Sequence, residues 1–476
     1  MSCVNGGVDR EIPPTGPSVS DGLLHAVSLF SNCGAGDVGY RDAGFQFDVI
    51  AELDPRRLSV ALLNHRSAIG VVGDLRNTWT AVVERWREVN GSARPALLAA
   101  CPPCQGMSSA RSGRGSHTDP VAGGRDDRNL LVTVIASVAA ALRPRAIVVE
   151  NVPAFLTRAV PHPADGRPIS AAWLLADALS ADYKLFAIVA DLADWGVPQT
   201  RKRAFLTLIR NDEVGLVELA EYGRTPFPRP AFTRDYGGEP VSMRRALAEL
   251  SLGALDASNA ESARDPIDEL HRVPVWNDKQ YRMVAAIPAD TGAGAWRNTA
   301  CSSCRSETTD PETAVCDSCG APLLRPIVLD KSTGSHRLIK GFRSTSYTRM
   351  RPDEPASTVT TASGHIGSDK TLHPWQNRVL SMRECAVLQT LPMSFDWGDA
   401  LAKWGHTNVR EMIGEAVPPL FTLQHGHAIA HVLDGRATAP LLVEVDQRVT
   451  RATAKLDGAR SLRPALPLDA PASWKR

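Results

Sequence analysis

A cysteine that follows an apolar run near residue 100 has the setting of a nucleophile. In LLAACPPCQGMSSARSGRG, Cys104 stands just beyond a predicted buried strand, after two prolines that stiffen the turn. Cys101 lies three residues earlier, so an inert buried thiol and a redox pair are the alternatives. A redox pair usually opens a helix without intervening prolines. We therefore expect Cys104 to be a nucleophile, and residues 105–126 to form either a solvated loop or a lid.

Polar residues also lie at the ends of two later apolar segments. RAIVVENVPAF places Glu150 and Asn151 at the end of an apolar predicted strand. Burial can hold such a carboxyl near neutrality, so that it shares a proton with a ring nitrogen, whereas helix capping by Asn151 is the alternative. In WGVPQTRKRAFLTL, Gln199, Arg201 and Arg203 alternate, so on a strand they share one face. They could converge on one anionic or carbonyl-rich ligand, or form a solvated strand face.

A glycine-rich loop follows the first predicted strand. In LFSNCGAGDVGYRDAGF, Gly34, Gly36 and Gly39 permit a tight turn and a close approach of the backbone to a ligand. The next strand ends at Glu52, which can accept hydrogen bonds from both ribose hydroxyls of a nucleoside cofactor. Asp74, in GDL, could approach the base. Glycine loops after strands are common, so this loop alone has low specificity.

Two Cys-x-x-Cys pairs occur late in the chain. They are Cys301, Cys304, Cys316 and Cys319, with eleven residues between the pairs. Four thiolates at this spacing satisfy tetrahedral zinc and leave no open position, so we expect a structural zinc site; free thiols are the alternative. The odd total of nine cysteines also argues against a secreted disulfide framework.

The segment SHRLIKGFRSTSYTRMR is basic and contains no acid. Its cations are Arg337, Lys340, Arg343, Arg349 and Arg351, and Phe342 and Tyr347 lie among them. This composition is typical of a surface that tracks phosphates, although a solvated basic face is the alternative. Because the formal net charge of the whole chain is only +1, any nucleic-acid binding must depend on such local charge.

Alternating apolar runs and helix-like segments must position these residues. LLHAVSLF, FDVIAEL, SAIGVVGDL, PALLAAC, RAIVVENV and AFLTLI read as strands, with WTAVVERWREV and LLVTVIASVAAALRP as helices between them. This alternation predicts an α/β domain with a parallel, doubly wound sheet covered on both faces.

The 476 residues predict two domains. We expect a loose arm over 1–21, the α/β domain over 22–210, an irregular second domain over 211–397, a return to the first domain over 398–448 and a flexible tail over 449–476. In the returning part, Pro418 and Pro419 suit the first turn of a helix. We find no long apolar stretch and no leader-like start, so we expect a cytoplasmic protein.

The order LFSNCGAG, PPCQG, DDRNLL, ENV, QTRKR, RECAVLQTLP and GEAVPP resembles the motif series of the cytosine-5 DNA methyltransferases. The resemblance covers roughly residues 23–210 and 350–435. It implies a Rossmann-like S-adenosylmethionine-dependent methyltransferase domain, with a smaller irregular target-recognition domain that carries the zinc knuckle. The implied function is methylation of carbon 5 of a cytosine flipped out of double-stranded DNA at a specific site.

The resemblance also implies roles for individual residues. Cys104 would add to carbon 6 of cytosine, Glu150 would steady ring nitrogen 3 and the exocyclic amine, Arg203 would contact the base's carbonyl and Arg201 would support it. The positions that match cofactor contacts are Phe30, Gly34, Glu52, Asp74 and Leu131.

Three positions depart from the family's pattern. Asn32 and Ala35 replace two glycines of the first motif, and asparagine tolerates a left-handed backbone better than most residues. Glu415 replaces the asparagine of Gly-Asn-Ala-Val-Pro-Pro. We hypothesise that Glu415 still contacts the cofactor, at its cationic end.

The resemblance further implies a monomeric, nucleoid-associated bacterial enzyme of a restriction-modification system, with a cognate endonuclease acting on the same site. An RNA enzyme of the tRNA-modifying kind is the runner-up, but the long variable region favours duplex DNA. A catalytically silent DNA-binding protein is a third possibility. The presence of Cys104, Glu150 and Arg203 argues against it, because a binding protein needs no nucleophile.

Overall fold

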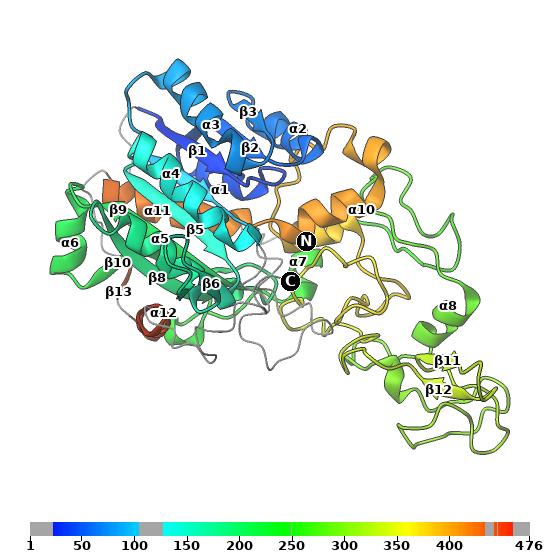
Figure 1. Ribbon diagram of the computed structural model, residues 1–476. Coiled ribbons are helices and arrows are strands. Elements are labelled where there is room, and N and C mark those ends of the chain that lie inside the picture. Colours follow the sequence, from blue (N-terminus) through cyan, green and yellow to red (C-terminus); the bar gives the residue numbers. More distant parts are fainter. Residues whose placement is uncertain (1–21, 104–126, 249, 434–441, 445, 460–476) are drawn as a thin grey trace, which may run out of the picture.

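A seven-stranded sheet with the strand order β3-β2-β1-β4-β5-β9-β8 forms the centre of the N-terminal half of the chain (Figure 1). Its strands are β1 (Leu24–Leu29), β2 (Phe45–Glu52), β3 (Ile69–Val72), β4 (Leu97–Ala100), β5 (Ala146–Asn151), β8 (Tyr183–Asp191) and β9 (Lys202–Arg210). The computed structural model describes residues 22–103, 127–248, 250–433, 442–444 and 446–459.

The sheet is mainly parallel, but the prediction of a wholly parallel sheet was wrong at one strand. Strand β9 runs antiparallel to both β5 and β8. The connection between β8 and β9 is short, residues 192–201, and contains the 3-10 turn η4 (Leu192–Trp195), which ends at Gly196 with φ 88°. A parallel return needs a long crossover, usually helical, so this short connection imposes the antiparallel pairing.

Helices cover both faces of the sheet, as the alternating pattern predicted. One face packs against α3 (Leu75–Asn90), α4 (Val132–Leu142), α5 (Ala171–Leu179) and α12 (Gln447–Gly458). The other face packs against α1 (Ala35–Asp42), α2 (Pro55–Asn64) and α11 (Pro419–Leu433). The result is a three-layer α/β/α domain, called the sheet domain below.

The C-terminal part of the chain returns to the sheet domain. Helices α9 (Met382–Leu388) and α10 (Ala400–Glu415) lead into α11, which begins at Pro419 as predicted. Helix α11 lies so close to α1 that a Cβ at Gly39 would overlap the backbone of Pro419. The prediction of a flexible tail was wrong for its first part. Helix α12 lies there, and its Ala452 and Leu456 side chains are fully buried against the sheet.

Residues just after 210, which we assigned to the second domain, also pack on the sheet domain. Helix α6 (Gly215–Glu221) contacts α11, and β10 (Arg224–Pro228) pairs with β13 (Leu442–Glu444). The buried side chain of Phe227 belongs to the same core as α11. A short hairpin of β6 (Ala159–Pro161) and β7 (Pro168–Ser170) precedes α5.

Residues 243–380, called the irregular region below, extend for the most part away from the sheet domain (Figure 1), although Ala356 and Val359 are buried against it. They contain α7 (Met243–Ala248), α8 (Asp278–Ala285) and a hairpin of β11 (Ile327–Leu329) and β12 (His336–Leu338). Most of the remaining backbone in this region is turn or loop.

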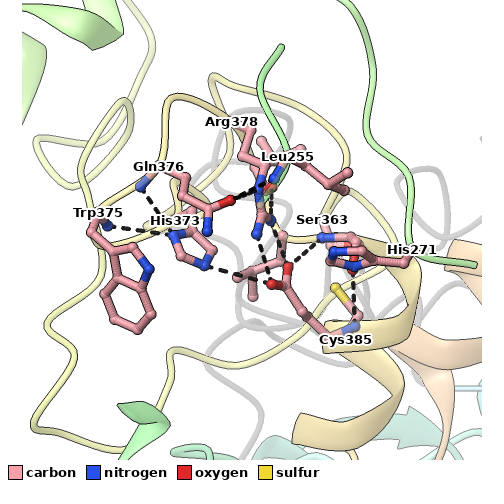
Figure 2. A network of polar contacts seen from close by, with 12 residues as sticks. Leu255, His271, Ser363, His373, Trp375, Gln376, Arg378 and Cys385 are labelled. Atoms are coloured by element: carbon pink, nitrogen blue, oxygen red, sulfur yellow. Dashed lines mark hydrogen bonds and ion pairs between the residues drawn. The ribbon is translucent and has the colours of Figure 1, made fainter. Parts of the chain in front are cut away.

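A buried polar network joins the irregular region to α9 (Figure 2). Arg378 donates from two guanidinium nitrogens to Glu384, at 2.6 and 2.8 Å, and His373 Nε2 lies 3.5 Å from the same carboxylate. Glu384 also accepts from the backbone N–H of Ser381, completing a capping box at the start of α9. His271 bonds to the Ser381 hydroxyl at 2.9 Å. The network therefore fixes the loop at His271 and the segment 373–378 on one helix.

Candidate active site

A cavity opens at the carboxyl ends of β1, β4 and β5, where the first loop and the turn between α10 and α11 meet. It is lined by Ser28, Leu29, Phe30, Ser31, Asn32, Ala35, Gly36, Asp37, Tyr40, Ala99, Ala100, Cys101, Val148, Glu150, Phe205, Glu415, Ala416, Val417 and Thr422. In open parallel sheets this edge is where ligands bind. The structure thus brings together Phe30, Glu150 and Glu415, which the sequence had singled out separately.

The glycine-rich loop adopts left-handed backbone at three successive alternate positions. Phe30 has φ 57°, Asn32 has φ 52° and Gly34 has φ 73°. The expectation that Asn32 tolerates this conformation is confirmed. A Cβ at Gly34 would come within 3.0 Å of Ala61 and His65, so glycine is also required there for close packing.

Glu52 lies at the end of β2 and braces this loop. Its carboxylate accepts from the backbone N–H of Asn32 at 2.8 Å and of Asp54 at 3.1 Å, and burial raises its pKa. Asp74 caps α3 and pairs with Arg76, whose hydrogen bond lowers the pKa of Asp74. Leu131 is buried in the sheet-domain core. None of these three side chains lines the cavity itself.

Glu150 is held between two donors at the cavity wall. Arg203 Nε donates to one carboxylate oxygen at 2.8 Å, and the Cys101 thiol donates to the other at 2.7 Å. The Glu150 side chain is 8% exposed. Asn151 donates to the carbonyl of Pro102, which ties the end of β5 to the turn that follows β4. The carboxylate is therefore fixed in place, with its donors supplied by neighbouring strands.

Gln199, Arg201 and Arg203 do not converge on one ligand, because Arg203 pairs with Glu150 of the cavity wall whereas the other two side chains bond elsewhere. Arg201 is 1% exposed and donates to the carbonyls of Val359, Gly414 and Ala416. Gln199 is fully buried and donates to the carbonyl of Leu388. These side chains hold the returning segments in place, and Arg201 fixes both residues that flank Glu415.

Glu415 lines the cavity and pairs with Arg57 of α2, a partner that sequence reasoning missed. Arg57 also lies 3.9 Å from Glu411. A charged residue such as Arg57, in the first turn of a helix, carries no sign of a contact with a residue 358 positions away. Only the return of α10 to α2 brings Arg57 and Glu415 together.

The predicted nucleophile Cys104 and the predicted loop 105–126 lie outside the described residues. The chain is described up to residue 103, immediately before the cysteine, and again from residue 127. Cys101, which precedes it by three residues, lines the cavity beside Glu150. The expected roles of Cys104 and of the loop stay predictions.

Asp37 is a cavity residue that sequence reasoning missed. It is 6% exposed, in the first turn of α1, and accepts a hydrogen bond from Ser28 at 2.8 Å. Nearby, the Tyr40 hydroxyl bonds to His425 of α11 at 3.1 Å, and His425 bonds to Thr207. The available signal was that Asp37 is an acidic residue in the first turn of α1, next to the apolar residue Val38.

The four cysteines of the two knuckles come together as expected. Their sulfur atoms all lie within 4.8 Å of one another. Arg325, 1% exposed, braces the surrounding loops by donating to the carbonyls of Asn298, Thr308, Asp310 and Thr313. Four thiols this close, with an ordered backbone around them, form a donor set that suits tetrahedral zinc.

The basic segment is only partly a surface. Arg349 is 2% exposed, so its expected role as a phosphate contact was wrong. Its guanidinium donates to the carbonyls of Val284, Ile287, His373 and Gln376 and to the Asn377 side chain. Lys340, Phe342 and Arg343 are exposed, and Arg343 lies 3.3 Å from Asp369.

In the described part of the chain no helix is both long and apolar enough to span a bilayer.

Several bacterial enzymes are similar to the chain over most of its length. The Type II methyltransferase M1.HgaI of Avibacterium volantium is 26% identical over 409 residues, which are 83% of this chain and 95% of that protein. M.DdeI of Desulfomicrobium norvegicum is 24% identical, over 83% of this chain and 86% of its own length. M.AgeI of Thalassovita gelatinovora is 23% identical, over 86% and 99%.

A solved structure shares the fold. It is a prophage-encoded protein of E. coli described as a DNA modification methyltransferase, with a TM-score of 0.51 and 18% identity, covering 86% of this chain and 99% of that one. The family model for C-5 cytosine-specific DNA methylases matches residues 24–431, which include the cavity, the irregular region and the returning helices. The chain belongs to the C-5 cytosine-specific DNA methylase family.

Proposed function

We propose that this protein methylates carbon 5 of a cytosine that is flipped out of a specific site in duplex DNA, through a transient bond from Cys104. The observation that carries the proposal is the placement of Glu150, clamped by Arg203, on the wall of the cavity beside the turn that leads to Cys104. Family membership supplies the reaction class, and S-adenosylmethionine is the methyl donor that the family uses.

The residues around the cavity fit this donor. Three carboxyl groups, those of Asp37, Glu150 and Glu415, line the cavity together with aromatic rings, which suits a cationic ligand. The side-chain oxygen of Asn32 is a buried acceptor with no donor among the described residues. A Cβ at Gly36 would lie 3.2 Å from Val417, so the glycine-rich loop packs closely against the turn between α10 and α11. We propose that Glu52 holds the ribose and that Asp74 and Leu131 lie toward the adenine.

The chain's own residues would act in a fixed order. The Cys104 thiolate adds to carbon 6 of the flipped cytosine, while Glu150 hydrogen-bonds to nitrogen 3 and the exocyclic amine and Arg203 contacts the carbonyl oxygen. Carbon 5 becomes electron-rich and takes the methyl group that the donor supplies. Loss of the carbon 5 proton to a base then expels the Cys104 thiolate and restores the ring. Arg201 acts as a positioning residue for the turn that carries Glu415.

We further propose that the irregular region, residues 243–380, holds the target-recognition function, with zinc bound by Cys301, Cys304, Cys316 and Cys319. Closed thiolate ligation would stabilise these loops and take no part in methyl transfer. Exposed Lys340 and Arg343 offer charge to phosphates beside the Phe342 ring. The Type II names of the relatives support a restriction-modification role and a cognate endonuclease.

The test is methyl transfer from tritiated S-adenosylmethionine to mixed duplex DNA or to tRNA, followed by mapping of the modified base. We expect label at carbon 5 of cytosine in DNA alone. Cys104→Ser should transfer almost nothing, whereas Cys101→Ser should keep measurable transfer, because its hydroxyl can still donate to Glu150.

An oligonucleotide with 5-fluorocytosine at the mapped site should become covalently joined to the protein when the methyl donor is present. Labelling of tRNA alone would favour the RNA enzyme. Absence of any adduct, with transfer retained in Cys104→Ser, would overturn the proposed mechanism.

A further inference from the structure

We infer that Asp37 recognises the positive charge at the methionyl end of the methyl donor, and that its protonation makes cofactor binding depend on pH. This inference rests on the proposed function, since it assigns a role to a residue of the same cavity. The cation that Asp37 would contact is either the sulfonium or the ammonium of the methyl donor.

The geometry places Asp37 at the cavity with one oxygen engaged. Ser31 donates to the Ser28 hydroxyl at 2.7 Å, and Ser28 donates to one carboxylate oxygen of Asp37 at 2.8 Å. All three residues line the cavity. The serine chain therefore holds the carboxyl in one orientation, and no cation is paired with it within the described residues.

The other charged groups around the cavity are already committed. The titratable side chains that line the cavity with Asp37 are Tyr40 on the same helix, Cys101 after β4, Glu150 on β5 and Glu415 at the end of α10, and His425 on α11 bonds to Tyr40. Glu150 pairs with Arg203, and Glu415 pairs with Arg57. Asp37 is thus the cavity carboxyl without a basic side chain as partner, so a bound cation would supply the missing charge.

Burial makes the ionised form of Asp37 costly until such a cation arrives. Desolvation raises its pKa from 3.8 to about 7, despite the hydrogen bond from Ser28. A cation that enters the cavity favours the carboxylate, so cofactor binding should release a proton near neutral pH. The affinity should consequently rise as the pH passes upward through about 7.

The experiment measures binding without DNA, by isothermal titration calorimetry of the full chain with S-adenosylmethionine and with S-adenosylhomocysteine at pH 6, 7 and 8. We expect Asp37→Asn to weaken S-adenosylmethionine binding about 10-fold at pH 8 but only about 2-fold at pH 6, where Asp37 is already neutral. Comparison with the variant cancels the titration of the cofactor itself. Equal weakening of both ligands would assign the contact to the ammonium, and weakening of S-adenosylmethionine alone to the sulfonium.

Two further readouts separate recognition from structure. Titrations in two buffers of different ionisation enthalpy should show that the wild type releases about half a proton more than Asp37→Asn at pH 7. Because the buried carboxylate opposes folding above that pH, Asp37→Asn should melt at the same or a higher temperature at pH 8. A structural acid would instead show a lower melting temperature on substitution.

Asp48→Asn is the matched control, since Asp48 is equally buried on β2 but does not line the cavity. It should leave the affinity and proton release unchanged. Wild-type affinity and proton release in Asp37→Asn would overturn the inference alone. Failure of the wild type to bind S-adenosylmethionine at any pH would overturn the proposed function as well.

Discussion

In the sheet domain the buried backbone groups bond to one another, whereas in the irregular region several of them bond to arginine side chains. Strand β5 is buried along its whole length, and its N–H and C=O groups pair with β4 and β9. In the irregular region Arg325 and Arg349 each donate to four backbone carbonyls, which for Arg349 lie at the end of α8 and in the segment 373–376. Backbone hydrogen bonds between strands form with any side chains that fit the core. The carbonyls held by an arginine clamp, meaning one buried guanidinium that donates to several carbonyls, lose their donors when that one residue is substituted.

We therefore expect different kinds of substitution to destabilise the sheet domain and the irregular region. Substitutions in the sheet domain remove packing and leave the backbone bonds in place. Substitutions of a clamp in the irregular region leave several buried carbonyls without donors. A long loop region with few regular elements can therefore be held by a small apolar core together with a few arginine side chains and the cysteine cluster.

The largest difference should follow removal of metal from the cluster of Cys301, Cys304, Cys316 and Cys319. Structural zinc sites contribute about 10 kcal/mol or more to folding, so a chelator should unfold the irregular region. Hydrogen exchange followed by mass spectrometry should show lost protection around residues 295–330, with protection of β1, β4 and β5 unchanged. DNA binding should fall while binding of the methyl donor persists. Unchanged protection after chelation, with no metal found by elemental analysis, would contradict the zinc assignment.

A smaller effect is expected from Arg349→Met, which removes one clamp while keeping an apolar stem of similar length. We expect the free energy of unfolding of the irregular region to fall by about 3–5 kcal/mol, because buried carbonyls lose their donors. Urea unfolding followed by tryptophan fluorescence would measure it. Arg337→Met is the matched control: Arg337 is 48% exposed, and its loss should change stability by less than about 0.5 kcal/mol. If the two substitutions changed the free energy of unfolding equally, Arg349 would not stabilise the irregular region through its bonds to buried carbonyls.

The smallest effect concerns pH at the network of His373, Arg378 and Glu384. Burial lowers the pKa of His373 from 6.5 to about 4, and its Nδ1 accepts backbone N–H bonds, as a neutral ring does. The unfolded chain therefore takes up a proton before the folded one does, so stability is full above about pH 6.5 and is lost as the pH falls through about 4.

Between pH 7 and pH 5 this histidine should account for about 2 kcal/mol of lost stability. Urea titrations of the wild type and of His373→Gln at both pH values would measure it, since the variant should lack that share of the loss. Burial of Glu384 opposes its ionisation, but the charge of Arg378 holds its pKa well below the usual range, which adds a further loss below about pH 4.5. An identical pH dependence in the variant would show that His373 does not titrate in this way.

Local signals in the sequence were sufficient for much of the sheet domain and for part of the site. Apolar runs marked six of the seven strands, the proline pair marked the start of α11, and the close spacing of the four cysteines marked their cluster. Glu150 was found because it ends an apolar strand at the edge where ligands bind. These features depend on residues a few positions apart, so the chain carries their signal within one short segment.

Only the tertiary structure decided which polar residues serve the site and which hold the fold. Arg201 and Arg349 looked like ligand contacts in sequence, yet both are buried on carbonyls of distant segments. The pairing of Glu415 with Arg57, and the place of Asp37 at the cavity, likewise depend on helices that return from the far end of the chain. An arginine has the same local sequence signal on a surface as in a clamp, because its role depends on which backbone groups the fold brings within reach of its guanidinium.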